Sequence, residues 1–109
     1  MQKKYESEFV EIVSKNSNKL LEQKINESKK EVEQSQARLT KLDLYIQRLY
    51  EDNVEGKVSD EQFIKMSSNY EREQSTLTAR IKELQSIIKN EQEKVANTNS
   101  FLNLLLQYN

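Results

Sequence analysis

The sequence predicts an all-α fold, a long antiparallel two-helix coiled-coil hairpin with a tight turn near Gly56. Three observations lead to this prediction. The 109 residues include no proline and one glycine, so little interrupts a helix except one point near the middle. Apolar residues recur at heptad spacing in both halves. A helix stop followed by a helix start lies between the halves, so we expect helices over about 3–54 and 60–107 with a turn over about 55–59.

The first half carries one narrow apolar stripe. Its positions advance in steps of four and three, and they are Leu21, Ile25, Ser28, Val32, Ser35, Leu39, Leu42, Ile46 and Leu49. Taking Ile25 and Val32 as a positions places the leucines at 42 and 49 at d, the arrangement that coiled coils favour. We call this stripe, together with its counterpart in the second half, the seam.

The second half repeats the same spacing. Its positions are Phe63, Ser67, Tyr70, Gln74, Leu77, Ile81, Leu84, Ile88, Glu91, Val95, Thr98, Leu102 and Leu105. Because the connection between the halves is short, the two stripes are expected to bury each other as antiparallel neighbours. Polar residues interrupt the seam, and they either set the register or mark a marginally packed coil; among them are Ser28, Ser35, Ser67, Gln74 and Glu91.

The residues between the two stripes have the chemistry of a helix end and a helix start. Gly56 suits the left-handed position that follows a helix, because it has no Cβ to clash there. Ser59 is expected to cap the second helix in a capping box with Gln62, and Val58 to pack as a hydrophobic staple against Phe63. We therefore interpret Gly56, Ser59 and Gln62 as the turn and cap residues.

Two registers of the helices remain open. Centring the turn between Gly56 and Ser59 sets Leu39 near Leu77, and this is the register we favour. A shift by one heptad would instead set Val32 near Leu77.

The composition excludes several classes of function. Lys and Arg total 17 against 18 Asp and Glu, a net charge of −1, which argues against a surface that holds nucleic acid by neutralising phosphates. The chain has no cysteine and no histidine, which removes the thiolate and imidazole ligands of metals and the commonest general base. Glu71 and Glu73 do not face each other on a helix. We expect no catalytic residue, metal or cofactor, no direct nucleic-acid contact, no membrane segment and an intracellular location.

Two regions carry apolar residues beyond the seam. Tyr45, Tyr50, Val54, Val58 and Phe63 lie at or near the turn, where they form either a docking patch or local turn packing. We expect Val58 and Phe63 to be structural and Tyr50 and Val54, which lie off the seam, to be contact residues. At the other end, apolar residues cover more than one helix face, at Tyr5, Phe9, Val13, Leu20 and in the stretch from Phe101 to Tyr108.

The tip segment, residues 43–61, is acidic. It contains two basic residues, Arg48 and Lys57, and six acidic ones, namely Asp43, Glu51, Asp52, Glu55, Asp60 and Glu61. Acids at the carboxyl end of a helix are disfavoured by the helix dipole. The cluster is therefore either a solvated face or a hint of a protein partner.

Several segments resemble the coiled-coil insertion of large serine recombinases, the transposon resolvases and phage-type integrases. These segments are Leu42-Asp43, the run from Leu49 to Phe63, and Tyr70-Glu71, with Tyr5 to Val10 and Asn99 to Tyr108 resembling the approach to the coil and its exit. In such recombinases the catalytic serine lies in a separate domain and the zinc ligands in a ribbon that flanks the coil. The resemblance implies that this chain is an excised part of a larger bacterial protein that acts on DNA in the cytoplasm.

The resemblance also implies a role and partners. The role is a non-catalytic arm that joins recombinase subunits in the synaptic complex and regulates the direction of recombination. The partners would be another copy of the same coiled coil in a recombinase tetramer and a directionality factor. The alternative is a free-standing structural coiled coil that self-associates as a spacer or adaptor.

Overall fold

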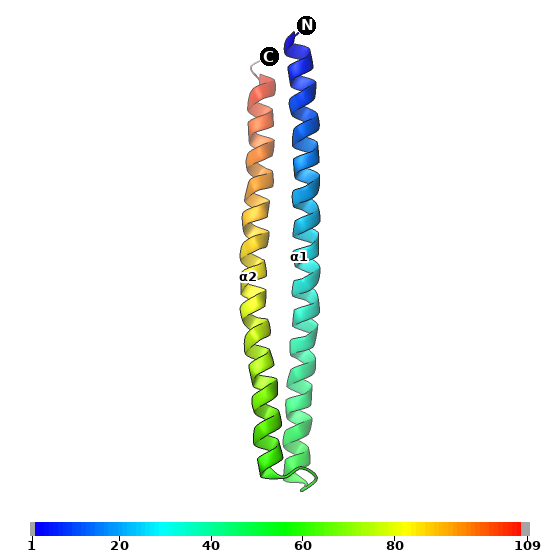
Figure 1. Cartoon of the computed structure of the whole chain (residues 1–109), viewed down its shortest axis with the longest axis vertical. Coiled ribbons are helices and arrows are strands. Elements are labelled where there is room, and N and C mark those ends of the chain that lie inside the picture. Colours follow the sequence, from blue (N-terminus) through cyan, green and yellow to red (C-terminus); the bar gives the residue numbers. More distant parts are fainter. Residues whose placement is uncertain (1, 108–109) are drawn as a thin grey trace. The chain divides into compact units, whose positions relative to one another are not determined.

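Two long helices joined by one tight turn make up the fold. The computed structural model describes the backbone of residues 2–107 and the side chains of residues 18–107. Helix α1 spans Gln2–Val54 and helix α2 spans Asp60–Gln107, and they run antiparallel on either side of the turn (Figure 1). No strand occurs between residues 2 and 107. The predicted all-α helical hairpin is confirmed, and the helix bounds fall within one residue of those expected.

The hairpin divides into two compact units. The turn unit is Glu31–Leu84, which contains the turn and the adjoining parts of both helices. The terminal unit consists of α1 up to Lys30 and α2 from Gln85 onward.

The seam forms the core of the turn unit. Leu42 is fully buried, with 0% of its surface exposed, and Leu49, Ile81 and Leu84 are also buried. The remaining seam positions of this unit are buried or half-buried, as the heptad assignment predicts. Burying a leucine side chain stabilises a fold by about 1.5 to 3 kcal/mol, so these few residues supply much of the driving force for helix pairing.

The terminal unit has a more polar seam. Ile25 is buried together with Ser28 and Glu91, and Asn18 Nδ2 donates a hydrogen bond across the helices to Asn99 Oδ1 at 2.8 Å. Large apolar side chains lie exposed on this unit at Leu20, Phe101, Leu104 and Leu106. The other apolar residues expected here, Tyr5, Phe9, Val13 and Tyr108, lie outside the described side chains.

The turn has the predicted chemistry at both ends. Gly56 has a φ of 79°, in the left-handed region. Its N–H donates to the carbonyl of Asn53 at 3.1 Å and that of Lys57 donates to the carbonyl of Asp52 at 2.8 Å, the two bonds of a Schellman motif. Helix α2 then begins with the expected capping box, in which the Gln62 N–H donates to Ser59 Oγ at 3.1 Å and the Ser59 N–H donates to Gln62 Oε1 at 3.3 Å.

One cross-helix contact in each unit lies close to the favoured register, whereas the bridges Arg38–Glu73 and Arg80–Glu31 lie closer to the shifted one. In the turn unit, Tyr45 packs against Tyr70. The favoured register places position 71 opposite Tyr45, whereas the shifted register places position 64 there. In the terminal unit, Lys24 Nζ lies 3.3 Å from Glu91 Oε1. The favoured register places position 92 opposite Lys24, whereas the shifted register places position 85 there. Both contacts therefore fall within one residue of the favoured register.

Candidate protein-contact site next to the turn

Aromatic side chains near the turn pair across the two helices. The rings of Tyr50 and Phe63 meet edge-on, with centroids 6.3 Å apart at 63°. The rings of Tyr45 and Tyr70 are tilted by 41° at 6.0 Å, and the Arg38 guanidinium carbon lies 5.7 Å from the Tyr45 ring centroid. Such pairs add about 0.5 to 1.5 kcal/mol beyond simple burial, so Tyr45 and Tyr50 have a packing role as well as any contact role.

The five predicted contact residues differ in how much surface they leave free. Val58 and Phe63 are half-buried, as the local packing of the turn requires. Val54 is 68% exposed and Tyr50 is 59% exposed despite its contact with Phe63, and Tyr45 is exposed as well. The structure thus separates two half-buried residues from three that present apolar surface to solvent, and among these three Tyr50 and Val54 are the most exposed.

Three exposed apolar residues in the same region were missed by the sequence analysis, and the least exposed of them is Met66, at 41%. Leu44 is 60% exposed on α1 and Ile64 is 63% exposed on α2. Both lie off the seam at heptad positions that usually carry polar residues, and this spacing is the signal that would have found them. Leu44 lines a shallow groove on α1, together with Tyr45, Gln47, Arg48 and Glu51. We call this groove, with Tyr50 and Val54 beside it, the α1 outer face.

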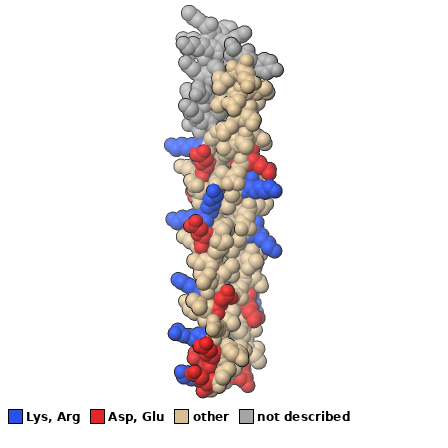
Figure 2. Space-filling view, turned by 180° about the vertical axis from the view of Figure 1, so that it is seen from behind, with Lys and Arg blue, Asp and Glu red and all other residues tan. Residues whose placement is uncertain are grey.

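The surroundings of this face are acidic. Figure 2 shows acidic side chains gathered at the end of the turn unit that carries the turn. Some carboxylates of the tip segment have partners: Lys57 Nζ lies 2.9 Å from Glu55 Oε2, and Gln74 Nε2 donates to Asp43 Oδ1 at 2.6 Å. Phosphate groups would be repelled from such a surface, whereas a protein partner can supply matching charges.

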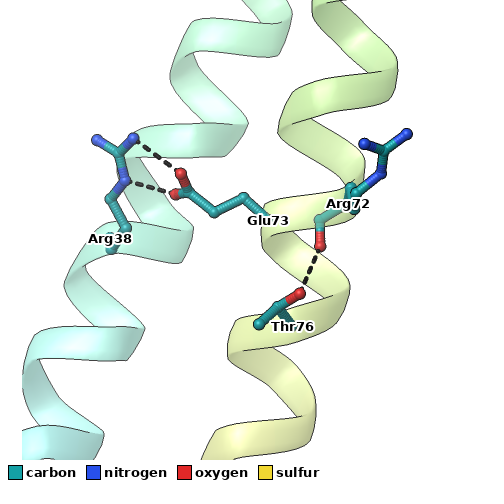
Figure 3. Close-up of polar contacts among 4 residues, drawn as sticks. All are labelled: Arg38, Arg72, Glu73 and Thr76. Atoms are coloured by element: carbon teal, nitrogen blue, oxygen red, sulfur yellow. Dashed lines mark hydrogen bonds and ion pairs between the residues drawn. The ribbon is translucent and has the colours of Figure 1, made fainter.

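Two arginine–carboxylate bridges join α1 to α2 in the turn unit, and neither bridge was predicted from the sequence. Arg38 Nε and Nη2 donate to the two carboxylate oxygens of Glu73 at 2.6 and 3.2 Å (Figure 3). Arg80 makes the same bidentate contact with Glu31 at 2.6 and 3.1 Å. The hydrogen bonds from the arginines lower the pKa of Glu73 and of Glu31. These bridges orient the helices and are not free for a partner.

Arg72 stands in contrast to these bridged arginines. The Thr76 hydroxyl donates to the Arg72 carbonyl at 3.1 Å, while the Arg72 guanidinium points away from α1 (Figure 3). It makes no ion pair within the described part of the chain. Arg72 is therefore a suitable control position for changes of charge.

Glu91 is a carboxylate buried in the seam of the terminal unit. Its side chain is only 6% exposed, and its Oε1 lies 3.3 Å from Lys24 Nζ and 3.5 Å from Lys94 Nζ. Burial by itself would raise the pKa of Glu91, but the two ammonium groups more than offset burial and lower that pKa. Its Oε2 is buried without a hydrogen-bond partner in the described structure.

Metal-ligand clusters and membrane-spanning stretches are absent from the described residues. No three metal-ligating side chains come together between residues 18 and 107. Over the described residues, neither helix contains an apolar stretch that would suffice to cross a membrane. Comparisons with protein families, with curated proteins and with solved structures found no match for this chain.

Proposed function

We propose that the chain is a non-catalytic protein–protein interaction arm of a site-specific DNA recombinase, which joins subunits in synapsis and controls the direction of recombination. One observation carries the proposal: Tyr50 and Val54 present exposed apolar surface immediately before a turn that is fully capped without them. Interface energy concentrates in a few aromatic and apolar anchors, and Tyr50 has the chemistry of such an anchor.

The charge of the region favours a protein over DNA as the partner. The tip segment contains six acidic residues against Arg48 and Lys57, and DNA affinity depends on basic surface that neutralises phosphates. In the proposed recombinase, DNA binding belongs to other parts of the protein. The arm would contribute only contacts between proteins, with another copy of the coiled coil and with a directionality factor, in the bacterial cytoplasm.

The resemblance of the run from Leu49 to Phe63 to the recombinase insertion gives the proposal its biological setting. The residues of that resemblance include the turn and cap residues Gly56, Ser59 and Gln62, whose geometry forms a compact helix reversal. A firmly closed turn holds the neighbouring side chains in fixed positions, which reduces the entropy lost when a partner binds.

The test is a double substitution in the parent recombinase, Tyr50→Ala with Val54→Ala. We expect normal binding to one DNA site and impaired assembly of two DNA-bound dimers into a synapse, both measured by gel shift with one site and then two. A matched control is Ser68→Ala with Ser75→Ala, at exposed positions of α2. Normal synapsis by the Tyr50 and Val54 variant would refute the proposal. Loss of single-site binding would refute it too, because it would place DNA affinity in the arm.

A second function is favoured by the terminal unit. Leu20, Phe101, Leu104 and Leu106 are exposed there, and such surface would also allow a free-standing coiled-coil adaptor to self-associate. The reading frame that encodes the chain separates the two functions. A serine recombinase domain and a zinc ribbon in the same frame would support the first function, and a frame that encodes only these residues would support the adaptor.

A further inference from the structure

The α1 outer face combines apolar surface with charges of both signs. Leu44 is 60% exposed and lines the groove with Tyr45, and both neighbour the charged side chains of Arg48 and Glu51. Val54 follows Glu51 by three residues and so continues the same face toward the turn. An exposed surface of this kind is a docking surface whose partner must supply both apolar and charged groups.

Three charged side chains of this face are unpaired in the described structure, whereas Glu55 is paired with Lys57, whose Nζ lies 2.9 Å from Glu55 Oε2. Within residues 18–107, neither Lys41, Arg48 nor Glu51 takes part in an ion pair, although Arg38 and Arg80 are both bridged. Along α1 the basic residues Lys41 and Arg48 come first, and the acidic residues Glu51 and Glu55 follow toward the turn. The face therefore changes sign from basic to acidic within about four helical turns.

We propose that the occupant of the α1 outer face is the same face of a second copy of this chain, packed antiparallel around a twofold axis near Gln47 to Tyr50. In this arrangement Arg48 of each copy meets the partner's Glu51. Lys41 lies toward the partner's Glu55, which also keeps its exposed contact with Lys57 of its own chain. Leu44 packs toward the partner's Val54. An isologous contact of this kind needs a self-complementary surface, and the order of charges along α1 provides one.

The antiparallel direction follows from the electrostatics. A parallel pairing would set Arg48 against the partner's Arg48 and would bring the two acidic tip segments together, which like-charge repulsion disfavours. The antiparallel pairing places the acidic end of each α1 beside the basic stretch of its partner. The inference rests on the proposed function in taking a second copy as the partner, and it adds the face, the direction and the charge pairs.

The contact is small, so it is weak for the free chain. One helix face of about three turns buries less than the roughly 1,200 Å² of the smallest stable interfaces. Within a larger assembly, a tether raises the effective concentration to the millimolar range and makes a weak contact sufficient. The free chain should accordingly show a concentration-dependent dimer at up to about 1 mM, where a millimolar Kd is measurable.

The test is a charge exchange followed by sedimentation equilibrium of the full chain. Arg48→Glu and Glu51→Arg should each weaken the dimer by about fivefold or more, since each replaces two attractive pairs by two repulsive ones. The double variant Arg48→Glu/Glu51→Arg should regain the parent affinity, and an equimolar mixture of the two single variants should form a heterodimer. Arg72→Glu and Glu93→Arg carry the same changes of net charge at exposed positions elsewhere and should leave the dimer unchanged.

The antiparallel direction of the pairing is tested by introducing cysteine, a residue that the chain lacks. A mixture of Leu44→Cys and Val54→Cys chains should form the mixed disulfide in preference to either symmetric one. A monomer at all concentrations, equal effects of the test and control variants, failure of the double variant to recover, or a preference for symmetric disulfides would each overturn the inference. None of these results bears on whether Tyr50 and Val54 are needed for synapsis, so the proposed function fails or stands by its own assay.

Discussion

The Asn53 side chain ties the end of α1 to the start of α2 through Asp60. Asn53 Nδ2 donates to Asp60 Oδ1 at 2.8 Å and to the Val58 carbonyl at 3.1 Å. Asn53 occupies the seam position one heptad after Ile46 and is half-buried. At the last a position of α1, a polar side chain thus replaces an apolar one and fixes the path of the chain through the turn.

The loss of this contact should be measurable. We expect Asn53→Ala to lower the free energy of unfolding by about 1 to 2 kcal/mol, because two hydrogen bonds are lost and the Val58 carbonyl loses a partner. Asn69→Ala, at an exposed position of α2, is the control with the same change in helix propensity. Thermal unfolding followed by circular dichroism compares them, and equal melting temperatures would show that the Asn53 contact does not stabilise the turn.

The cost of a substitution at Gly56 should depend only on how readily the new residue adopts a left-handed backbone conformation. A Cβ built on Gly56 meets no atom within 4 Å, but its φ of 79° is strained for other residues. We expect Gly56→Ala to cost about 1 to 2 kcal/mol, Gly56→Asn less, and the β-branched Gly56→Val most. If Gly56→Val has the melting temperature and the sedimentation behaviour of the parent, the turn does not depend on a left-handed residue.

Leu42 and Leu44 offer the same substitution on opposite faces of one helix. Leu42 is fully buried and Leu44 is 60% exposed. Leu42→Ala should destabilise the hairpin by about 2 kcal/mol or more, with the thin core keeping it near the low end of the range for buried leucines. Leu44→Ala should change stability by less than about 0.5 kcal/mol. Comparable destabilisation by the two variants in chemical unfolding would mean that the seam has been assigned to the wrong residues.

Much of the fold could be predicted because it depends on local and periodic signals. Heptad spacing identifies the seam that buries Leu42 and Leu84, and the chemistry of Gly56, Ser59 and Gln62 locates the turn. These residues act on neighbours within a few positions or through a regular repeat. Sequence alone therefore contains the information that places them.

The polar contacts of the fold could not be predicted in the same way. Arg38 and Glu73 are 35 residues apart in the sequence, and the heptad pattern, which left two registers open, does not show that their side chains meet. Asn53 lies one heptad after Ile46, and this spacing does not reveal that its side chain joins the two helix ends. The exposed residues Leu44 and Ile64 were within reach of the sequence, since they break the polar pattern outside the seam.

Acid should destabilise the hairpin through three carboxylates. Hydrogen bonds from arginine lower the pKa values of Glu31 and Glu73. Burial opposes a low pKa at Glu91, but the neighbouring lysines outweigh burial and lower the pKa of that carboxyl too. A carboxyl with a lowered pKa stabilises the fold above its unfolded pKa, near the ordinary value of 4.5, and this stability is lost as the pH falls through the folded pKa.

Glu73 is the carboxylate at which this pH dependence is tested. Glu73→Gln should reduce the difference in unfolding free energy between about pH 6 and pH 3, because the amide cannot take up a proton in this range. Glu93→Gln, at an exposed position of α2, is the matched control and should leave that difference as in the parent. Identical pH profiles for both variants and the parent, measured by urea unfolding, would contradict the stabilising role of the Arg38–Glu73 bridge.

The proposed contact role of Tyr50 and Val54 is tested most directly by a competition measurement. The isolated chain is added in excess to the two-site synapsis reaction of the parent recombinase, in parallel with a Tyr50→Ala/Val54→Ala chain whose helicity has been checked by circular dichroism. We expect the parent chain to lower the yield of the two-site complex by occupying the contact surface, and the double variant to leave the yield unchanged. No inhibition by the parent chain, or equal inhibition by both chains, would contradict that contact role.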